Sequence, residues 1–403
     1  MQYESLYKLR YKAPRDYESI YQERFSQQDT IHLDFMIGEH PAFICQSTEM
    51  LHMIIRIHKA DKNIRALRAK LPPVAIGQFT MKCLIDEIVL TNKIEGVNST
   101  RKEITEVLEK LSEKKSDRRF HGLVMKYSML MDCASLKLDT CQDVRDIYND
   151  LVLREVVEEN PHDAPDGVIF RKEAVSVTNA AQKEIHQGIV PESAIQSAVQ
   201  TVLDFIKDDS IDLLIRTGAA HYLFGYIHPF YNGNGRLSRF ISSFLLTQEL
   251  DPLIAYRLSY TVKENLTQYD DAFKLCNDPR NYGDITPFVL WFLEVVQEAI
   301  VKLDSALSER AHDLERYRSL LKQSAILNTK TLYELSYYLI QASLFSDEGT
   351  STSTLIACTE LSRTTLMIRL KEIEQYGLLL VQRSGKEKVY KLNLAKFEQL
   401  ANG

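Results

Sequence analysis

The stretch His228-Pro229-Phe230-Tyr231-Asn232-Gly233-Asn234-Gly235-Arg236-Leu237-Ser238-Arg239 decides the fold of this chain of 403 residues. Because a proline follows the histidine, the sequence predicts an extended backbone at His228. Gly233 and Gly235 form a turn with Asn232 and Asn234, and glycine lets backbone N–H groups approach a ligand closely. The next apolar residues recur at helical spacing and predict a helix. They are Leu237, Phe240, Ile241, Phe244 and Leu245.

Two arginines on the first turn of this helix indicate an anion site. Arg236 and Arg239 are three residues apart, so they project together. A helix that begins at a glycine-rich turn binds anions through its free N–H groups. Two guanidinium groups suit a polyphosphate better than a single carboxylate, and a histidine at the mouth of the site is a candidate general base. An ordinary loop before a buried helix would not need these arginines.

The stretch resembles the signature of the Fic (Fido-domain) family, H-x-F-x-[D/E]-G-N-G-R-x-x-R. Eleven of the twelve positions fit, and only Asn232 departs. The resemblance implies a mainly α fold with a helical Fic/Fido core, and an adenylyltransferase that moves AMP from ATP to a Ser, Thr or Tyr hydroxyl of a target protein, including itself. It implies His228 as the catalytic base. The ATP-binding residues that it implies are Asn232, Gly233, Asn234, Gly235, Arg236, Arg239 and, near the adenine, Tyr269.

Asn232 stands where the family places an acidic metal ligand. The resemblance implies Mg²⁺ as the cofactor, with Mn²⁺ as the alternative ion. The amide oxygen of Asn232 can still coordinate a cation, but it lacks the negative charge that hard cations prefer. We therefore expect slow transfer with a raised metal requirement.

A second motif ends the helix predicted from about residue 77 to residue 94. Gly96 suits the position after a helix. Glu95 lies in the last turn, where the helix dipole disfavours a negative charge, so either a cationic partner or solvent must compensate it. The segment Thr91 to Gly96 resembles the family's inhibitory motif, [S/T]-x-x-x-E-[G/N]. The resemblance implies that Thr91, Glu95 and Gly96 are inhibitory and that Glu95 pairs with Arg239 and blocks the γ-phosphate.

Residues 170–188 resemble the β-hairpin flap of Fic proteins. Residues 175–178 alternate like a strand, residues 179–182 are predicted to turn, and residues 184–187 are predicted to return. In the family this hairpin holds a target segment by strand addition.

We expect three domains: a helical region with the inhibitory helix over 1–120, the Fic/Fido catalytic domain over 121–312, and a winged-helix-like domain over 325–403.

The last of these domains resembles a winged helix. Helices are predicted near residues 331–344, 354–359 and 362–376, and strands are predicted at 378–382 and 388–392 around a Ser384-Gly385 turn. Residues 362–391 contain seven basic and three acidic side chains. DNA binding fits this local charge, and a dimerisation or docking module fits equally.

The composition of the chain limits its possible partners and location. The net charge of −6 argues against general coating of nucleic acid. No apolar run has membrane-spanning length, so no membrane partner is expected. The six cysteines are scattered, which indicates neither a zinc site nor a disulfide framework and favours a cytoplasmic location.

Three alternatives to adenylyl transfer stay open. One is a hydrolase that removes AMP, with Glu95 aligning a water. Another is a Fic enzyme that uses a different nucleotide or a phosphocholine donor. The third is a DNA-binding regulator with a nucleotide-sensing Fic domain. A homodimer is compatible with each of them, and no Walker pattern supports a P-loop kinase.

Overall fold

The computed structural model describes residues 3–111, 118–132, 136–178, 184–384 and 387–402. By its packing the chain divides into two compact units. The first comprises Met1–Asp61, Glu87–Ser99 and Val107–Val301, and the second comprises Lys62–Asp86, Thr100–Glu106 and Lys302–Gly403. The domain boundaries that we expect at residue 120 and at residues 312–325 stay predictions.

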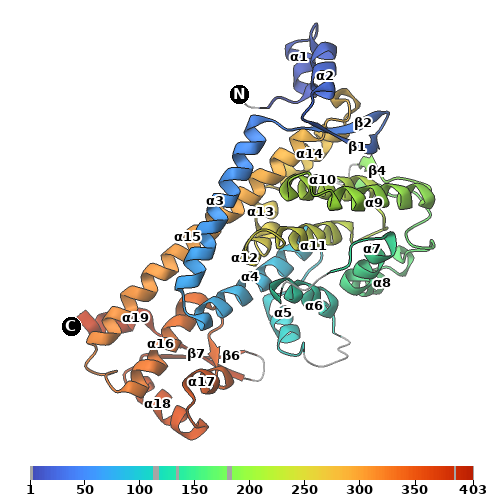
Figure 1. Cartoon of the computed structure of the whole chain (residues 1–403). Helices are drawn as coiled ribbons and strands as arrows, with labels where there is room; N and C mark the ends of the chain where they lie inside the picture. Colours follow the sequence, from blue (N-terminus) through green and yellow to red (C-terminus); the bar gives the residue numbers. More distant parts are fainter. Residues whose placement is uncertain (1–2, 112–117, 133–135, 179–183, 385–386, 403) are drawn as a thin grey trace. The chain divides into compact units, whose positions relative to one another are not determined.

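The first unit is mainly helical, as the sequence predicts (Figure 1). Its α-helices are α1 Leu6–Lys12, α2 Tyr17–Ser26, α6 His121–Met129, α7 Cys141–Tyr148, α8 Arg154–Glu159, α9 Glu192–Lys207, α10 Leu213–Ile227, α11 Asn234–Leu246, α12 Pro252–Ala255, α13 Leu258–Glu264 and α14 Leu266–Asn277. Short turns of other helix types are η1 Leu130–Asp132, η2 Asn149–Leu153, η3 Pro161–Asp163 and η4 Pro279–Asn281. Its strands are β1 Thr30–Ile37, β2 His40–Cys45, β3 Ser176–Thr178 and β4 Glu184–Gln187.

Four further helices contribute residues to both units. They are α3 Thr48–Lys70, α4 Pro73–Ile94, α5 Arg101–Leu108 and α15 Thr286–Gln323. Helix α4 contains the predicted helix that ends at residue 94. It begins at Pro73, and a proline in the first turn loses no helical hydrogen bond.

The core of the first unit forms around α10 and α11, which carry the two ends of the decisive stretch. Both helices are buried along nearly their whole length. Helix α10 is apolar on all sides, as expected of a helix surrounded by protein. It packs on α11 and on α9, which lies beside it (Figure 1). The loop from His228 to Gly233 is therefore held between two rigid elements.

The predicted helical region over 1–120 needs one correction, because residues 30–45 form an antiparallel β-hairpin. Strand β1 alternates buried Ile31, Leu33, Phe35 and Ile37 with exposed neighbours. This period of two is the pattern of a strand with one buried face. The signal is present in the sequence, but the flanking aromatic residues of α1 and α2 obscure it.

The flap hairpin is confirmed. Strands β3 and β4 pair in antiparallel fashion, with Ser176 opposite Gln187 and Val177 opposite His186. The predicted turn at residues 179–182 lies outside the described residues. Further along the chain, the π-helical turn η2 separates α7 from α8.

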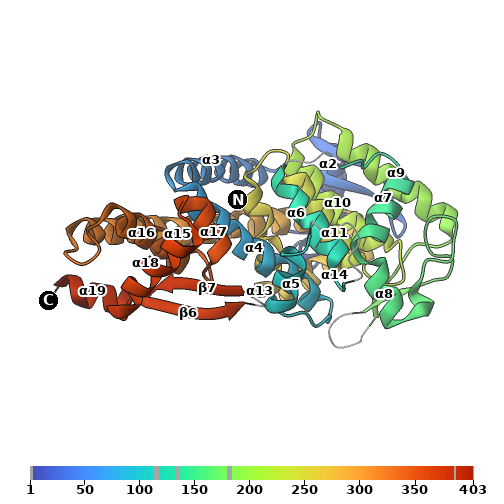
Figure 2. The ribbon, with the colours of Figure 1, turned by 90° about the horizontal axis from the view of Figure 1, so that it is seen from below.

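The second unit contains α16 Lys330–Phe345, β5 Thr350–Ser351, α17 Thr352–Thr359, α18 Arg363–Gln375, β6 Leu379–Ser384, β7 Glu387–Leu392 and α19 Leu394–Asn402. Its three strands form a sheet in the order β5-β7-β6, with β6 and β7 antiparallel and side by side (Figure 2). The predicted turn at Ser384-Gly385 reaches outside the described residues. Identification of this unit as a winged helix stays a prediction.

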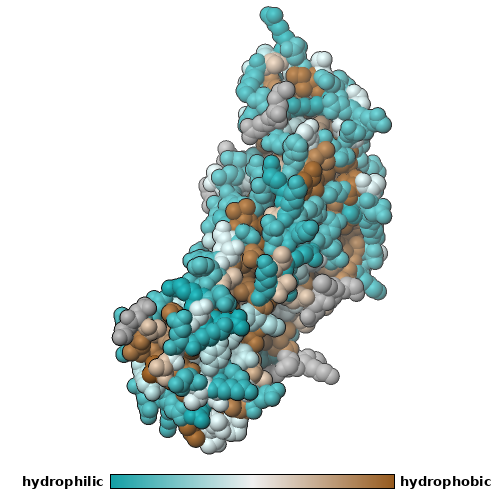
Figure 3. Space-filling view, turned by 60° about the vertical axis from the view of Figure 1, so that its left-hand side comes forward, coloured by the Kyte–Doolittle hydropathy of each residue, from teal (hydrophilic) through white to brown (hydrophobic). Residues whose placement is uncertain are grey.

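The surface drawn in Figure 3 is mostly hydrophilic, with apolar residues in small scattered patches. In the described part of the chain, none of the helices combines the length and the hydrophobicity needed to span a bilayer.

A buried carboxylate fixes the middle of α4 within the first unit. Glu87 is fully buried and accepts hydrogen bonds from the Ser259 N–H at 2.9 Å and from the Ser259 hydroxyl at 2.5 Å. Burial raises the pKa of Glu87 to about 7, although the bonds from Ser259 act against this shift. A carboxyl group whose pKa is raised by folding stabilises the folded state most when it is protonated.

We expect the stability contribution of Glu87 to be complete below pH 4.5 and to disappear as pH rises through about 7. Relative to Glu87→Gln, the wild-type chain should lose up to about 3 kcal/mol of unfolding free energy over this range. Urea unfolding at pH 4.5, 6 and 8 measures the difference. The exposed Glu159→Gln change is the control, and parallel pH curves for wild type and Glu87→Gln would contradict the expectation.

Candidate functional site

The backbone at His228 is left-handed helical, so the predicted extended conformation is wrong. His228 has φ 52° and ψ 63°, and its N–H donates to the carbonyl oxygen of Phe224 at 3.0 Å. This bond closes the C-terminus of α10 in the manner of a left-handed cap. The chain has to reverse between α10 and α11, and this requirement outweighs the preference that Pro229 imposes. Such strain in a residue other than glycine is typical of functional sites.

The His228 side chain is arranged as a neutral base. Its Nδ1 lies 3.3 Å from the carbonyl oxygen of Gly225, which can only accept a hydrogen bond. Nδ1 therefore carries the proton, and Nε2 keeps a free lone pair. Burial lowers the pKa of His228 to about 4. The imidazole is consequently uncharged at neutral pH and able to take a proton.

Phe230 and Asn234 hold the loop between the two helices. Phe230 is fully buried and stacks on Tyr148, with ring centroids 3.6 Å apart. The side-chain amide of Asn234 donates to Phe230 O at 2.8 Å, and its oxygen accepts from Phe230 N at 3.0 Å. Gly233, at φ 82°, provides the left-handed turn that starts α11. In this structure Asn234 fixes the loop, and a contact between its side chain and ATP stays a prediction.

Arg236 is a buried cation whose donors are not all satisfied. Its exposed fraction is 1%, and its Nε and Nη2 atoms have no hydrogen-bond partner among the described residues. Burial lowers its pKa, against the attraction of Glu95 and Glu155. A desolvated guanidinium with open donors is unfavourable unless an anion binds it. Arg236 therefore fits a phosphate ligand at the start of α11.

Arg239 is also 1% exposed, but its Nε and Nη2 donate to residues at the end of α4. Nε donates to Thr91 Oγ1 at 2.8 Å, and Nη2 donates to Thr91 O at 3.1 Å. The same Nη2 forms an ion pair with Glu95 Oε1 at 2.8 Å. Gly96 follows with φ 74° and ends the helix. The structure thus brings Thr91 and Glu95 of the second motif to Arg239, the second arginine of the first motif.

The Glu95 carboxylate lies at the N-terminus of α11, where an anion is expected. A Cβ atom added to Gly235 would overlap this carboxylate, so only glycine leaves room for it. Burial acts to raise the pKa of Glu95, but Arg239 and its other positive neighbours outweigh burial and lower it. The Glu95 side chain, 22% exposed, is therefore ionised and occupies part of the predicted phosphate site.

Tyr269 lies close to this pair. Its hydroxyl is 3.0 Å from His221 Nε2, and its ring packs against Trp291 with centroids 5.0 Å apart. Burial raises the pKa of Tyr269, and Arg239 and Glu95 both influence it. His221 is a buried residue of α10, and its Nδ1 lies 2.8 Å from Ser242 Oγ. Contact of Tyr269 with an adenine ring stays a prediction.

Arg171 is a site residue that the sequence reasoning missed. Its side chain is fully buried and donates only to backbone carbonyl groups. The acceptors are His228 O at 2.8 Å, Glu173 O at 2.5 Å, Ile189 O at 3.0 Å and Ile227 O at 3.4 Å. Arg171 therefore ties both ends of the flap to the backbone of the histidine. An isolated arginine in a polar segment gives no sequence pattern from which this could be predicted.

Asn232 is compatible with a divalent cation. Its Oδ1 accepts the Gly233 N–H at 2.6 Å and keeps a second lone pair. In the described ranges, no three His, Cys, Asp or Glu side chains are grouped to hold a metal. Mg²⁺ is usually bound by one or two protein oxygens together with substrate phosphates. A neutral oxygen with a free lone pair at the start of α11 fits such a shared site.

Comparisons with known proteins agree with this geometry. Residues 139–246 match the sequence model of the Fic/DOC family. A "Protein adenylyltransferase Fic" of Aedes aegypti is 32% identical over 93 residues, which are 23% of this chain and 17% of that protein. One of Drosophila grimshawi is 35% identical over 81 residues, which are 20% of this chain and 15% of that protein. The similarity therefore spans less than a fifth of these relatives.

A solved structure shows the same fold. The crystal structure of a Fic family protein from Desulfovibrio desulfuricans G20 superposes with a TM-score of 0.51 at 18% identity, covering 86% of this chain and 96% of that one. At this identity the likeness concerns the fold alone. The family match extends from α7 to α11, and the motif lies between α10 and α11. This chain therefore carries a Fic/DOC family domain.

Proposed function

We propose that this protein transfers AMP from ATP to a hydroxyl side chain of a protein and that Glu95 restrains the reaction. The observation that carries the proposal is the pair of buried arginines on α11. Arg236 has open donors, and Arg239 is bound by a carboxylate that stands in for an anionic ligand. Two such cations at a glycine-rich helix start are suited to a polyphosphate.

In this proposal His228 acts as the base. Its free Nε2 takes the proton of a Ser, Thr or Tyr hydroxyl, and the hydroxyl oxygen forms a bond to the α-phosphorus. The bond between this phosphorus and the bridging oxygen to the β-phosphate breaks, and pyrophosphate leaves. The arginines offset the charge on the leaving group. The N–H groups at the start of α11 hold the phosphates in place.

The cofactor that we propose is Mg²⁺. When bound, this ion neutralises and orients the phosphate groups, and Asn232 is the protein residue of the motif that fits it as an oxygen ligand. The chain itself positions the nucleotide through Arg236 and through the turn at Gly233.

The flap provides a docking edge for the target. Strands β3 and β4 form a two-stranded sheet of their own, so each strand has one edge without a neighbouring strand among the described residues. An extended target segment that adds to such an edge is held by main-chain hydrogen bonds. Because Arg171 binds the carbonyl groups of Glu173, Ile189 and His228, the docked segment and the base would keep a fixed relation.

Removal of AMP by hydrolysis is the second candidate, and the state of Glu95 favours it. The Glu95 carboxylate is ionised, is held by Arg239 and is still partly exposed. A fixed carboxylate of this kind can orient a water molecule for attack on a phosphorus. In transfer Glu95 is inhibitory, whereas in hydrolysis it is required, so the same residue separates the two reactions.

We expect His228→Ala to reduce AMP transfer by about 10²- to 10⁴-fold, because a general base contributes about this much. ATP binding should be unchanged, since the arginines remain. Incorporation of radiolabelled AMP measures transfer, and calorimetry measures ATP affinity. Wild-type activity should persist down to about pH 5, because the His228 pKa is lowered to about 4.

The exposed His162→Ala change is the control for this prediction. Near-normal transfer by His228→Ala, or an acid limb close to pH 6.5 in the wild-type chain, would refute the assignment of His228 as a neutral buried base.

We expect Glu95→Gly and Glu95→Gln to increase self-modification by at least about tenfold. The charge-assisted hydrogen bond to Arg239 is worth about 1.5–3 kcal/mol, and each 1.4 kcal/mol corresponds to a factor of ten. Intact-mass measurement after incubation with ATP and Mg²⁺ gives the extent of modification. Lys93→Gly controls for weakening of the helix end, since Lys93 is exposed in the same turn.

Equal or lower modification by folded Glu95 variants would contradict inhibition. If the same variants also lost the ability to remove AMP from a premodified target, hydrolysis would be the supported reaction.

A further inference from the structure

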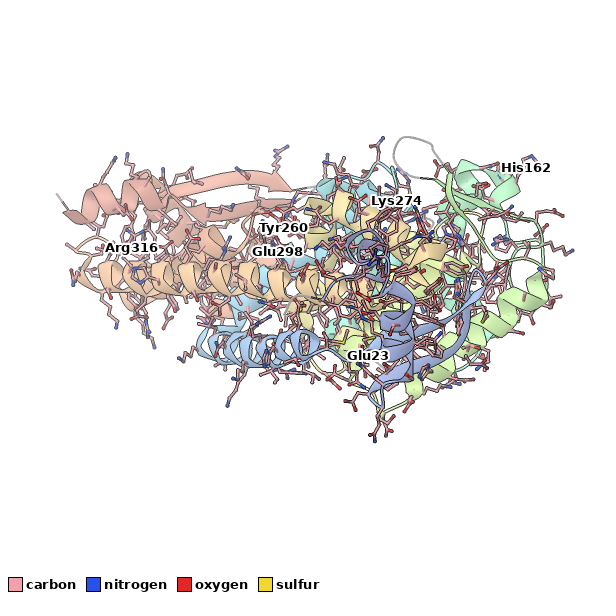
Figure 4. All side chains as sticks on the ribbon, turned by 90° about the horizontal axis from the view of Figure 1, so that it is seen from above. Glu23, His162, Tyr260, Lys274, Glu298 and Arg316 are labelled. Atoms are coloured by element: carbon pink, nitrogen blue, oxygen red, sulfur yellow. The ribbon has the colours of Figure 1, made fainter. Side chains whose placement is uncertain are left out.

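The structure places a carboxylate beside the one motif position that lacks it. Asp163 ends the short turn η3, which follows α8, and its neighbour His162 lies on the outer side of this turn (Figure 4). Asp163 Oδ2 accepts a hydrogen bond from Asn232 Nδ2 at 3.3 Å. The two residues are 69 positions apart in the sequence, so only the fold brings them together.

The two hydrogen bonds of Asn232 fix the direction of its amide group. Its oxygen faces the Gly233 N–H at the start of α11, and its nitrogen faces Asp163. An aspartate at position 232 would instead place two carboxylates against each other, which is unfavourable without a cation between them. Asn232 and Asp163 are therefore a matched pair in which the negative charge has moved to the second residue.

Asp163 has no cationic partner in the described part of the chain. Its other hydrogen bond comes from the side-chain amide of Asn160 at 2.9 Å, and no lysine, arginine or histidine there forms an ion pair with it. The side chain is half-buried. A partly desolvated carboxylate held only by amide groups retains its capacity to bind a cation.

A second observation indicates a ligand at this place. Tyr148 donates its hydroxyl to Asn232 O at 3.1 Å, and both Arg236 and Asp163 act electrostatically on Tyr148. Arg236, which has unsatisfied donors, and Asp163 thus both lie within electrostatic range of the tyrosine that contacts Asn232. A cationic group with open donors and a carboxylate near one another match a polyphosphate with its divalent cation.

We propose that Asp163 supplies the carboxylate of a divalent-cation site in which Asn232 supplies a neutral oxygen. Asp163 takes the part that an acidic residue at position 232 would otherwise have. This inference rests on the proposed function, because the remaining ligands come from the phosphate groups of a bound nucleotide. The site takes a hard cation such as Mg²⁺, for which Mn²⁺ is the spectroscopic probe.

The test measures Mn²⁺ binding by electron paramagnetic resonance on the full-length chain with α,β-methylene-ATP, which the transfer reaction cannot cleave. We expect Asp163→Asn to weaken Mn²⁺ binding about 10- to 100-fold, the range typical for loss of a residue that supports a metal. The exchanged variant Asn232→Asp/Asp163→Asn should restore binding to within a few-fold of wild type, because the carboxylate is returned to the pair.

Asp166→Asn is the matched control. Asp166 lies three residues further along the same segment, and its Oδ1 is occupied by the Lys172 N–H and by the Tyr231 hydroxyl, each at 3.0 Å. The Asp166→Asn change removes one negative charge, as Asp163→Asn does, but it leaves the partner of Asn232 in place. Mn²⁺ binding should therefore change less than twofold. Thermal unfolding of each variant shows whether it is folded.

Two results would overturn the proposal and distinguish its failure from that of the proposed function. If the wild-type chain binds the nucleotide but Asp163→Asn binds Mn²⁺ with unchanged affinity, Asp163 is not part of the site and the nucleotide site stands. If the wild-type chain binds no nucleotide with or without Mn²⁺, both proposals fail. If Asp163→Asn does not fold, the exchanged variant Asn232→Asp/Asp163→Asn decides the question. Unchanged Mn²⁺ affinity in that variant supports the inference, and loss of affinity refutes it.

Discussion

The buried ion pair between Arg239 and Glu95 is the interaction on which the rest of the site depends. Such a pair is stable only when both charges are well bonded, because desolvation opposes it. Thr91 accepts hydrogen bonds from Nε and Nη2 of Arg239. On the same helix, Glu87 holds α4 to Ser259 two turns earlier. Residues spaced four apart on one face of α4 thus place a carboxylate at the start of α11.

The two arginines of the motif differ in their hydrogen bonding. Arg239 is satisfied by α4, whereas Arg236 keeps open donors at the same helix start. The protein therefore presents half of an anion site and fills the other half with its own carboxylate. An incoming polyphosphate gains the bonds of Arg236 at once but competes with Glu95 for Arg239. The restraint that we propose for Glu95 rests on this competition for Arg239.

Backbone strain and its support are concentrated at the base. His228 adopts a left-handed conformation that side chains disfavour by roughly 1–2 kcal/mol. It persists because α10, Phe224 and the clamp of Arg171 determine it together. Arg171 is itself a buried cation, held by four carbonyl groups from the flap and the motif and by no carboxylate among the residues that the structure describes. Its bonds make the flap and the base a single unit.

The sequence by itself determined the features that depend on neighbouring residues. These are the glycine turn and helix after His228, the helix end at Gly96, the flap strands and the mainly helical class. Only the tertiary structure decided the backbone of His228, the hydrogen bonds of Arg171 and the contact of Asp163 with Asn232. Local sequence patterns indicate the period of the hydrophobic residues and the positions of turns. Buried polar bonds join residues from distant segments, and desolvation makes them decisive only when the fold has formed.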